Sequence, residues 1–513
     1  MRAFRLLILT GIMISVSFPS CKKFLEKNPL DAISSETFWN TDADAQMALT
    51  GCYHALYPAP GYPLSPFDWS RPYLDCLADN GFSQWGCYNW CITTIVTGDL
   101  NPSTSGLSPD LYRYYYKGIA AFNYFLANID KVKSIDANKK NLYIGEVKFL
   151  RALFYFDLVN FWGDVILYKE SPATPEDAKI GQSPKKEVLG FVKEDLDFAI
   201  ANLPNTAYSG HAVKGSAMAL KTRVLLYEEK WADASTLAKQ IMDEGKFSLG
   251  SNYEGLFLTS GQTNNPEIMF STVYLAPTLG QGRIVFGRAA NMEFGWGSHI
   301  SPYWDLVDAY ESIDGKSITE SPLYNATTPW LNRDPRLRYT IRMPNVKWPA
   351  GEPSGAPSLT GINMQKYVDL SQAPYSYSRG EQYDQDYVHI RFADVLLMYA
   401  EAKNEVSGPD ASIYDALDKI RSRTGVNMPG VDRAKYNTQG LLRDYVRHER
   451  RIELALEGQR YFDLKRWHIA HIILPKLKTP GGVPLVFEQK NYLLPFPQSE
   501  IDINPNLKQN PGY

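Results

Sequence analysis

The sequence lacks any concentration of charge of one sign. Its formal net charge is −3 over 513 residues, and nowhere do five like charges follow one another. Nucleic-acid binding depends on clustered lysine and arginine that neutralise phosphates, so this absence argues against DNA, RNA and other phosphate polymers as ligands. Beyond residue 20 the chain also lacks the run of about 18 apolar residues that a membrane helix requires. We therefore expect a soluble body.

Catalytic and metal-binding signatures are missing too. His448 and Glu449 are not followed by the second histidine of a zinc protease helix, because position 452 is isoleucine. Residues 315–317, Gly-Lys-Ser, resemble the end of a phosphate-binding loop, but Tyr310 occupies the place of its first glycine. No serine stands between glycines as in a hydrolase elbow. The sequence predicts no catalytic residue, no metal site and no cofactor.

Cysteines are few, and all five lie in the first 91 residues. Residues 1–20 have a charged start and an apolar stretch too short to span a bilayer, which predicts a secretory signal. Cys21 follows directly, at the place of a bacterial lipoprotein cleavage site, where the thiol is acylated; simple secretion is the alternative. The other four cysteines allow three pairings, and the sequence does not choose between disulfides and free thiols: Cys52, Cys76, Cys87 and Cys91.

Amphipathic helices with small residues recur along the chain and predict a mainly α fold. Apolar residues at spacings of three and four indicate helices over Leu111–Ile129, Leu142–Phe161, Pro184–Leu203, Lys214–Gly245, Phe392–Val406 and Ile413–Arg423. The segment Lys214–Gly245 is interrupted near Glu229 and is typical of a tetratricopeptide helix pair, with Gly245 as its C-cap. Early and late pairs are expected to stack into one right-handed framework. An open solenoid is the alternative.

Two long irregular regions interrupt the helices, at residues 58–109 and 250–387. Loops of this length are uncommon unless they carry function or structure of their own. Only short strands are expected there, over Ile268–Leu275 and Tyr339–Met343. We divide the chain into a signal (1–20), an N-terminal region (21–250) and a C-terminal region (251–513), the last two forming one compact body.

Seven of the eleven tryptophans fall in these irregular regions. A tryptophan in a loop either anchors that loop or waits for a ligand, and sugar rings stack on such aromatic planes while their hydroxyls bind amides and carboxylates. The segment 79–89, DNGFSQWGCYN, offers both kinds of group, and Trp296 stands between glycines in FGWGSHISPYW. The candidate ligand-binding residues are Asp79, Asn80, Trp85, Tyr88, Asn89 and Trp296. For each ring, loop anchoring is the alternative, and it is favoured for Trp304.

The run 449–468, ERRIELALEGQRYFDLKRWH, places charges at helical spacing. Four of them recur at i, i+3, i+7 and i+10, which forms one stripe on a helix: Arg450, Glu453, Glu457 and Arg460. The pattern indicates a paired ionic network. An exposed face of salt bridges, each worth about 0.2–0.5 kcal/mol, is the alternative.

This run closely resembles the C-terminal signature of the SusD/RagB family, nutrient-binding lipoproteins of the Bacteroidetes outer membrane. Further segments resemble other parts of the family pattern: Cys21–Tyr57, Pro302–Lys316, Phe392–Glu405, Ile420–Gly425 and Leu494–Tyr513. The resemblance implies tetratricopeptide-type helix pairs supporting a loop-rich subdomain with little β structure. It also implies a ligand site built from the two irregular regions, which supports the roles given to Trp85, Tyr88, Asn89 and Trp296.

The function implied by this resemblance is capture of an oligosaccharide or polysaccharide at the cell surface. The ligand passes to a SusC-type TonB-dependent transporter of the outer membrane, and the protein is held there by lipid at Cys21. Four tyrosines lie within five positions and form one candidate surface for the transporter: Tyr112, Tyr114, Tyr115 and Tyr116. The alternatives are a binder of peptide or another non-sugar nutrient and a glycoside hydrolase, which requires paired carboxylates about 5–9.5 Å apart.

Overall fold

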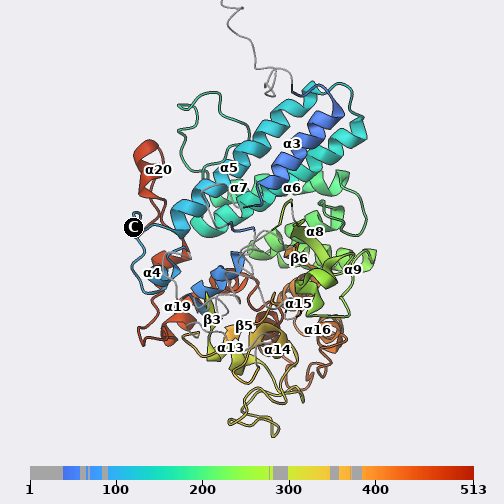
Figure 1. Ribbon diagram of the computed structural model, residues 1–513, viewed down its shortest axis with the longest axis vertical. Coiled ribbons are helices and arrows are strands. Elements are labelled where there is room, and N and C mark those ends of the chain that lie inside the picture. The colour runs from blue at the N-terminus through green and yellow to red at the C-terminus, as the bar shows by residue number, and fades with distance from the viewer. Residues whose placement is uncertain are drawn as a thin grey trace, which may run out of the picture.

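The computed structural model describes residues 38–57, 65–67, 70–83, 90–276, 278–280, 299–346, 358–369, 371 and 384–513. Helices dominate these residues and strands are short (Figure 1), which confirms the mainly α prediction. The longer helices are α3 (Asp42–His54), α5 (Leu107–Asn128), α6 (Ala137–Trp162), α7 (Lys185–Asn202), α8 (Lys214–Tyr227), α9 (Trp231–Glu244), α15 (Phe392–Ser407), α16 (Ala411–Ser422) and α17 (Gln439–Glu453). All six predicted helical segments are therefore present, with shifted ends.

Consecutive helices pack side by side from α5 to α9, and α15 then packs on α9 and α8. Helices α16 and α17 cover the other side of α15. Early and late helices thus share one framework, with α3, α5 and α6 at one end of the molecule and α16 toward the other (Figure 1). Gly245 ends α9 with φ +64°, as its predicted role in the C-cap requires.

Helix α6 is buried on all sides from Phe149 to Trp162. Close packing against α5 requires Gly118, where an added Cβ would lie 2.2 Å from the Phe154 ring. The single arginine of its apolar face, Arg151, is buried and binds both carboxylate oxygens of Asp195 on α7 at 2.7 and 2.9 Å. Such a paired and hydrogen-bonded charge is tolerated in a core.

The tyrosine cluster on α5 is not a docking surface, and that prediction is wrong. Tyr112 and Tyr115 are buried, and Tyr115 donates a hydrogen bond to Asp157 at 3.0 Å. Tyr114 and Tyr116 are half-buried, and their hydroxyls donate to the backbone carbonyls of Ala55 and Ile166. All four rings pack against the core because neighbouring loops cover the helix on several sides.

The strands form three two-stranded ribbons among the described residues. Strand β2 (Ile268–Thr272) pairs with β6 (Tyr387–Arg391), and β4 (Ile341–Arg342) pairs with β5 (Asn363–Met364). Both predicted strands exist but are shorter, since residues 339 and 340 end the short helix α14 (Arg336–Thr340). The third ribbon, β1 (Gly81–Ser83) with β3 (Ile300–Pro302), supports the candidate site.

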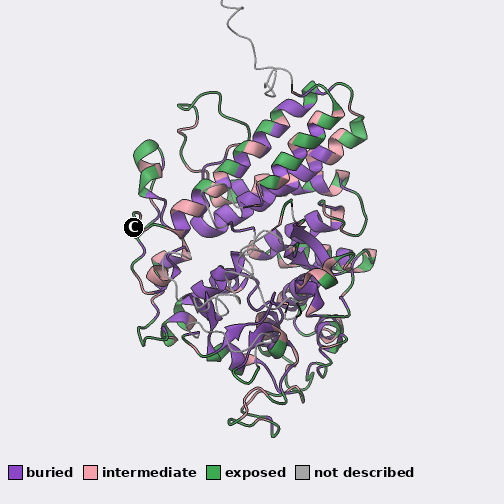
Figure 2. Ribbon diagram, viewed as in Figure 1, coloured by how far each residue is buried: buried purple, intermediate pink, exposed green. Residues whose placement is uncertain are grey.

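One hydrophobic core runs through the described residues from Trp39 to Leu507. Buried segments form the interior of both the helical framework and the loop-rich part (Figure 2). The remaining helices are short: α4 (Ile92–Val96), α10 (Thr259–Gln262), α13 (Trp304–Ala309), α18 (Arg460–Arg466), α19 (Ala470–Ile473) and α20 (Gln498–Ile503). In the described part of the chain, none of the helices has the length and apolar character needed to cross a bilayer.

Candidate ligand-binding site

The two segments that carry the candidate aromatic residues join the described structure at one end of the β1–β3 ribbon. The strands are antiparallel and Ser83 lies opposite Ile300. Residues 84–89 follow Ser83, and residues 281–298 precede β3 with only His299 between them. In an antiparallel pair, the chain leaves one strand at the end where it enters the other. The attachment points of both segments are therefore adjacent.

Helix α4, which follows the first segment, is bonded to the end of strand β1, which precedes it. The Thr93 hydroxyl on this helix donates to the carbonyl of Ser83 at 2.6 Å, so the chain after residue 89 returns to the point where it left β1. Cys91 forms a disulfide bond, whereas Cys52 and Cys76 are buried thiols. Trp90 is 1% exposed, and its carbonyl accepts from Leu107 N at 3.0 Å. Trp90 therefore anchors the loop.

Residue His299 fixes the end of the second segment. It is buried, and its Nδ1 lies 3.2 Å from the hydroxyl of Tyr73, on the 3-10 helix η1 (Arg71–Leu77). The two rings stack with centroids 6.0 Å apart. Tyr73 also contacts Trp90 edge to face, with centroids 6.3 Å apart. One tyrosine thus links the bases of both segments.

Asp79 and Asn80, which were predicted to meet ligand hydroxyls, are 4% and 0% exposed and are bound by arginines. Arg460 grips both carboxylate oxygens of Asp79 at 2.7 and 2.9 Å. Arg451 donates to the Asn80 side chain at 3.0 Å and to the Asp79 carbonyl at 2.7 Å. In this structure the two residues hold the stem of the loop instead of facing outward. Trp85, Tyr88, Asn89, Trp296 and the lipidation residue Cys21 lie outside the described residues.

The run 449–468 does not form one helix. Helix α17 ends at Glu453 and α18 begins at Arg460, with Leu456 and Gly458 between them at positive φ. An added Cβ on Gly458 would lie 2.6 Å from atoms of Arg71, so glycine is required there. Each of the four charges of the predicted stripe consequently has a partner in a distant part of the chain, and Arg450 also binds Asp463 within the run. The predicted single stripe is wrong.

The prediction of an ionic network is confirmed, and the network is buried. Glu453 accepts from Arg336 at 2.8 Å, from Arg391 at 2.7 Å and from Arg423. Burial alone raises the pKa of Glu453, but these three arginines outweigh it and hold the pKa well below its usual range. The other members pair in the same way: Glu267, Glu311, Asp334, Lys366, Arg421, Glu449 and Glu457.

A neighbouring carboxyl group, Asp75, is buried directly under the loop stem. It accepts from the backbone N–H of Arg460 at 3.2 Å and from the Asn80 side chain at 3.3 Å. Burial raises the pKa of Asp75 to about 7. The folded protein therefore binds a proton here at pH values where the unfolded chain has already lost it.

Asp75 is expected to make the folded state less stable as pH rises. Because the pKa of Asp75 is higher in the folded state than in the unfolded chain, its contribution to the free energy of unfolding is complete below about pH 4. This contribution is lost as pH rises through about 7. Relative to Asp75→Asn, the wild-type protein should lose on the order of 3 kcal/mol of unfolding free energy between pH 4 and pH 8. Urea titrations at both pH values measure this difference. An equal difference at both values would contradict the assignment.

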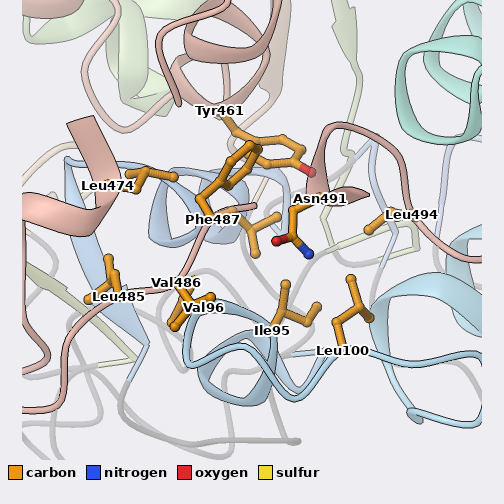
Figure 3. Close-up of a pocket in the computed structure, with 11 residues that line it drawn as sticks. Ile95, Val96, Leu100, Tyr461, Leu474, Leu485, Val486, Phe487, Asn491 and Leu494 are labelled. Atoms are coloured by element: carbon orange, nitrogen blue, oxygen red, sulfur yellow. The ribbon is translucent and has the colours of Figure 1, made fainter. Parts of the chain in front are cut away.

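Two cavities lie near the ribbon, and neither has the features of a glycan site. The first is enclosed by aliphatic and aromatic side chains around Asn491 (Figure 3), but its volume of about 20 Å³ admits only about one water molecule. The second is a groove of about 330 Å³ beside Trp304. The Trp304 indole is 37% exposed, and it donates to the carbonyl of Thr360 at 3.0 Å, which agrees with loop anchoring.

Comparison with known proteins decides the family. A solved structure of a SusD-like carbohydrate binding protein from Bacteroides fragilis is 30% identical, with a TM-score of 0.81 over 92% of this chain and 100% of that chain. The chain belongs to the SusD/RagB family. The SusD family model matches residues 266–513, and a model described as "Starch-binding associating with outer membrane" matches residues 23–226.

Other SusD-like proteins match along their whole length. SusD-like protein P25 of Formosa agariphila is 26% identical over 99% of both chains. A second SusD-like structure from Bacteroides fragilis is 26% identical, with a TM-score of 0.79 over 95% of this chain and 100% of that chain. These matches confirm the resemblance inferred from the run 449–468.

Proposed function

We infer that this SusD-family protein captures a glycan with the aromatic residues of the two segments that adjoin the β1–β3 ribbon, residues 84–89 and 281–298; these segments are called the two loops below. The pairing of Ser83 with Ile300 carries this inference, because it joins the bases of the segments that hold Trp85 and Trp296. An extended chain advances at most about 3.6 Å per residue. Trp85 is two residues from Ser83 and Trp296 is four from Ile300, so one oligosaccharide can reach both rings.

Chemistry and family membership both favour a sugar as the ligand. Indole and phenol rings stack on the C–H face of a pyranose, and the Asn89 amide can bind its hydroxyls. A relative at 30% identity is described as a carbohydrate binding protein, which supports the same class of ligand. The Asp79 carboxylate at the loop stem is held by Arg451 and Arg460, so it has no free oxygen for acid or base catalysis. We therefore propose a binding protein and not a hydrolase.

The proposed setting is the cell surface. Acylation of Cys21 would tether the protein to the outer membrane, and a SusC-type TonB-dependent transporter would receive the glycan. A family description that names the outer membrane supports this localisation. The partner surface is unassigned, because the α5 tyrosines are packed inside. Co-purification of the transporter with the tagged lipoprotein from the producing cell tests the partnership, and its absence would count against it.

Replacing either Trp85 or Trp296 by alanine should weaken glycan binding about five- to thirtyfold. Loss of a stacking ring removes about 1–2 kcal/mol, and tenfold corresponds to 1.4 kcal/mol. The lipid-free protein is first screened on an array of neutral and acidic oligosaccharides, and the best array glycan is titrated calorimetrically.

The matched control is Tyr124→Ala, which removes an exposed ring on α5, 47% exposed and far along the chain from both loops. Unchanged affinity in both tryptophan variants would contradict the site. Binding of a peptide library with no array hit would favour the non-sugar alternative, and new reducing ends after incubation would favour a hydrolase.

A further inference from the structure

A second cavity lies away from the ribbon, and its volume is about 420 Å³. Residues from the end of α6, the start of α7, the end of α8 and helix α18 line it, together with residues 492 and 493. Such a volume is within the range of about 300–1,000 Å³ typical of small-molecule sites. Two lysines, Lys185 and Lys465, stand in its wall. We call it the lysine cavity.

Lys465 is buried in this wall, with 8% of its surface exposed. Its ammonium group donates to the carbonyl of Asn160 at 2.7 Å and lies 4.8 Å from the centre of the Tyr461 ring. Asn160 is in the last turn of α6, so capping of this helix accounts for one of its three N–H donors. The other two N–H donors of Lys465 are not used by capping. No protein anion balances its buried charge among the described residues.

Neither lysine has a carboxylate within 4.0 Å among the residues that the structure describes. Asp164 accepts from the backbone N–H of Lys185, and its charge attracts the ammonium group only at longer range. Arg466, also in the wall, is already paired with Glu401 and Asp463. The positive charge available to a ligand is therefore that of the two lysines.

Two carboxylates also line the cavity. Glu228 is paired with Lys193 at 2.6 Å, and Glu229 is exposed at the turn after α8. Glu228 attracts Lys185 at longer range, but burial lowers the pKa of Lys185 overall. Burial, and then the neighbouring charge of Lys185, lower the pKa of Lys465 well below its usual range. The two lysines repel each other, and burial removes water from their charges. A bound anion offsets both the repulsion and the loss of water.

We propose that the lysine cavity binds an oxyanion, a carboxylate or sulfate group, between the ammonium groups of Lys185 and Lys465. The anion is either free in solution or carried by an acidic sugar of about monosaccharide size, which the cavity can hold. The remaining donors of Lys465 bind its oxygens, and Lys185 closes over it from the start of α7. This site is independent of the aromatic loops.

The test is calorimetric titration of the folded, lipid-free protein at pH 7.5 with sodium sulfate, glucuronic acid and glucose, at an ionic strength held constant with sodium chloride. We expect sulfate or glucuronic acid to bind, and glucose not to bind. Tighter binding of glucuronic acid identifies an acidic sugar, and tighter binding of sulfate a free oxyanion.

Lys185→Met should weaken anion binding at least tenfold without unfolding the protein, since this lysine is only half-buried. Lys465→Met should abolish it, although loss of the α6 cap also lowers stability. The matched control is Lys221→Met, which removes a lysine paired with Asp197 on a helix surface and should bind like wild type. No anion binding by the wild type, or equal affinity in wild type and Lys185→Met, would overturn the proposal.

Discussion

Glu453→Gln should lower the free energy of unfolding by about 3–5 kcal/mol, the range observed when one partner of a buried ion pair is removed. Glu453 lies at the centre of the ionic network, and its side chain is fully buried. Three arginines, Arg336, Arg391 and Arg423, share its two oxygens. Glutamine keeps the size of the side chain but leaves three guanidinium groups with one negative charge fewer. Guanidinium chloride unfolding of the lipid-free protein measures the loss.

The control for this prediction is Glu320→Gln, which breaks a surface pair with Lys435 whose side chains are nearly half exposed. Exposed pairs contribute about 0–1 kcal/mol, so this variant should resemble wild type. Adding Arg423→Gln to Glu453→Gln restores the balance of charge and should recover part of the lost stability. A loss below about 1 kcal/mol for Glu453→Gln, or no recovery in the double variant, would show that the network charges contribute little.

The double variant Asp79→Asn with Arg460→Gln should weaken glycan binding about tenfold or more, although neither residue is proposed to touch the sugar. Arg460 grips Asp79 at the stem of the first loop, and Asp79 is two residues before β1. Changing both residues removes one charge of each sign. Arg451 loses its ion pair with Asp79 but keeps its hydrogen bonds to the Asn80 side chain and the carbonyl of residue 79, so the fold should largely be kept. The variant removes the ion pair that holds the stem of the first loop. Trp85 must then be ordered when the glycan binds, and this ordering lowers the affinity.

Calorimetric titration with the array glycan measures this effect, and thermal unfolding confirms that the double variant is folded. The matched control is Arg443→Met, which breaks a two-pronged pair with Glu405 at 2.5 and 2.6 Å on a part of α17 that does not contact the stem. Equal affinity for the stem variant and this control would mean that the ionic anchor does not position the loop.

The sequence was sufficient to predict the helical framework. Helical periodicity located α5 to α9, α15 and α16, because each helix shows its buried stripe within a single window of the sequence. The ends of the helices differ from the prediction by a few residues. The length of the strand β4 was overestimated, because its two-residue pairing depends on partners 21 and 23 residues away and not on local propensity.

The site was harder to predict, because its parts come from distant places in the chain. No local signal announces that Ser83 pairs with Ile300, or that Arg460 binds Asp79 across 381 residues. Asp79 and Asn80 were predicted to bind a ligand because their side chains are polar, but residue type does not reveal whether a side chain is buried. The turn at Leu456 and Gly458 likewise broke a stripe that spacing alone had placed on one helix.

The central claim is that one glycan is held by both loops at once. Hydrogen–deuterium exchange of the lipid-free protein, with and without a saturating concentration of the array glycan, tests it most directly. We expect slower exchange in peptides covering residues 84–89 and in those covering 291–298, with no change in α6. Protection confined to one of the two segments, or found only elsewhere in the chain, would contradict the account.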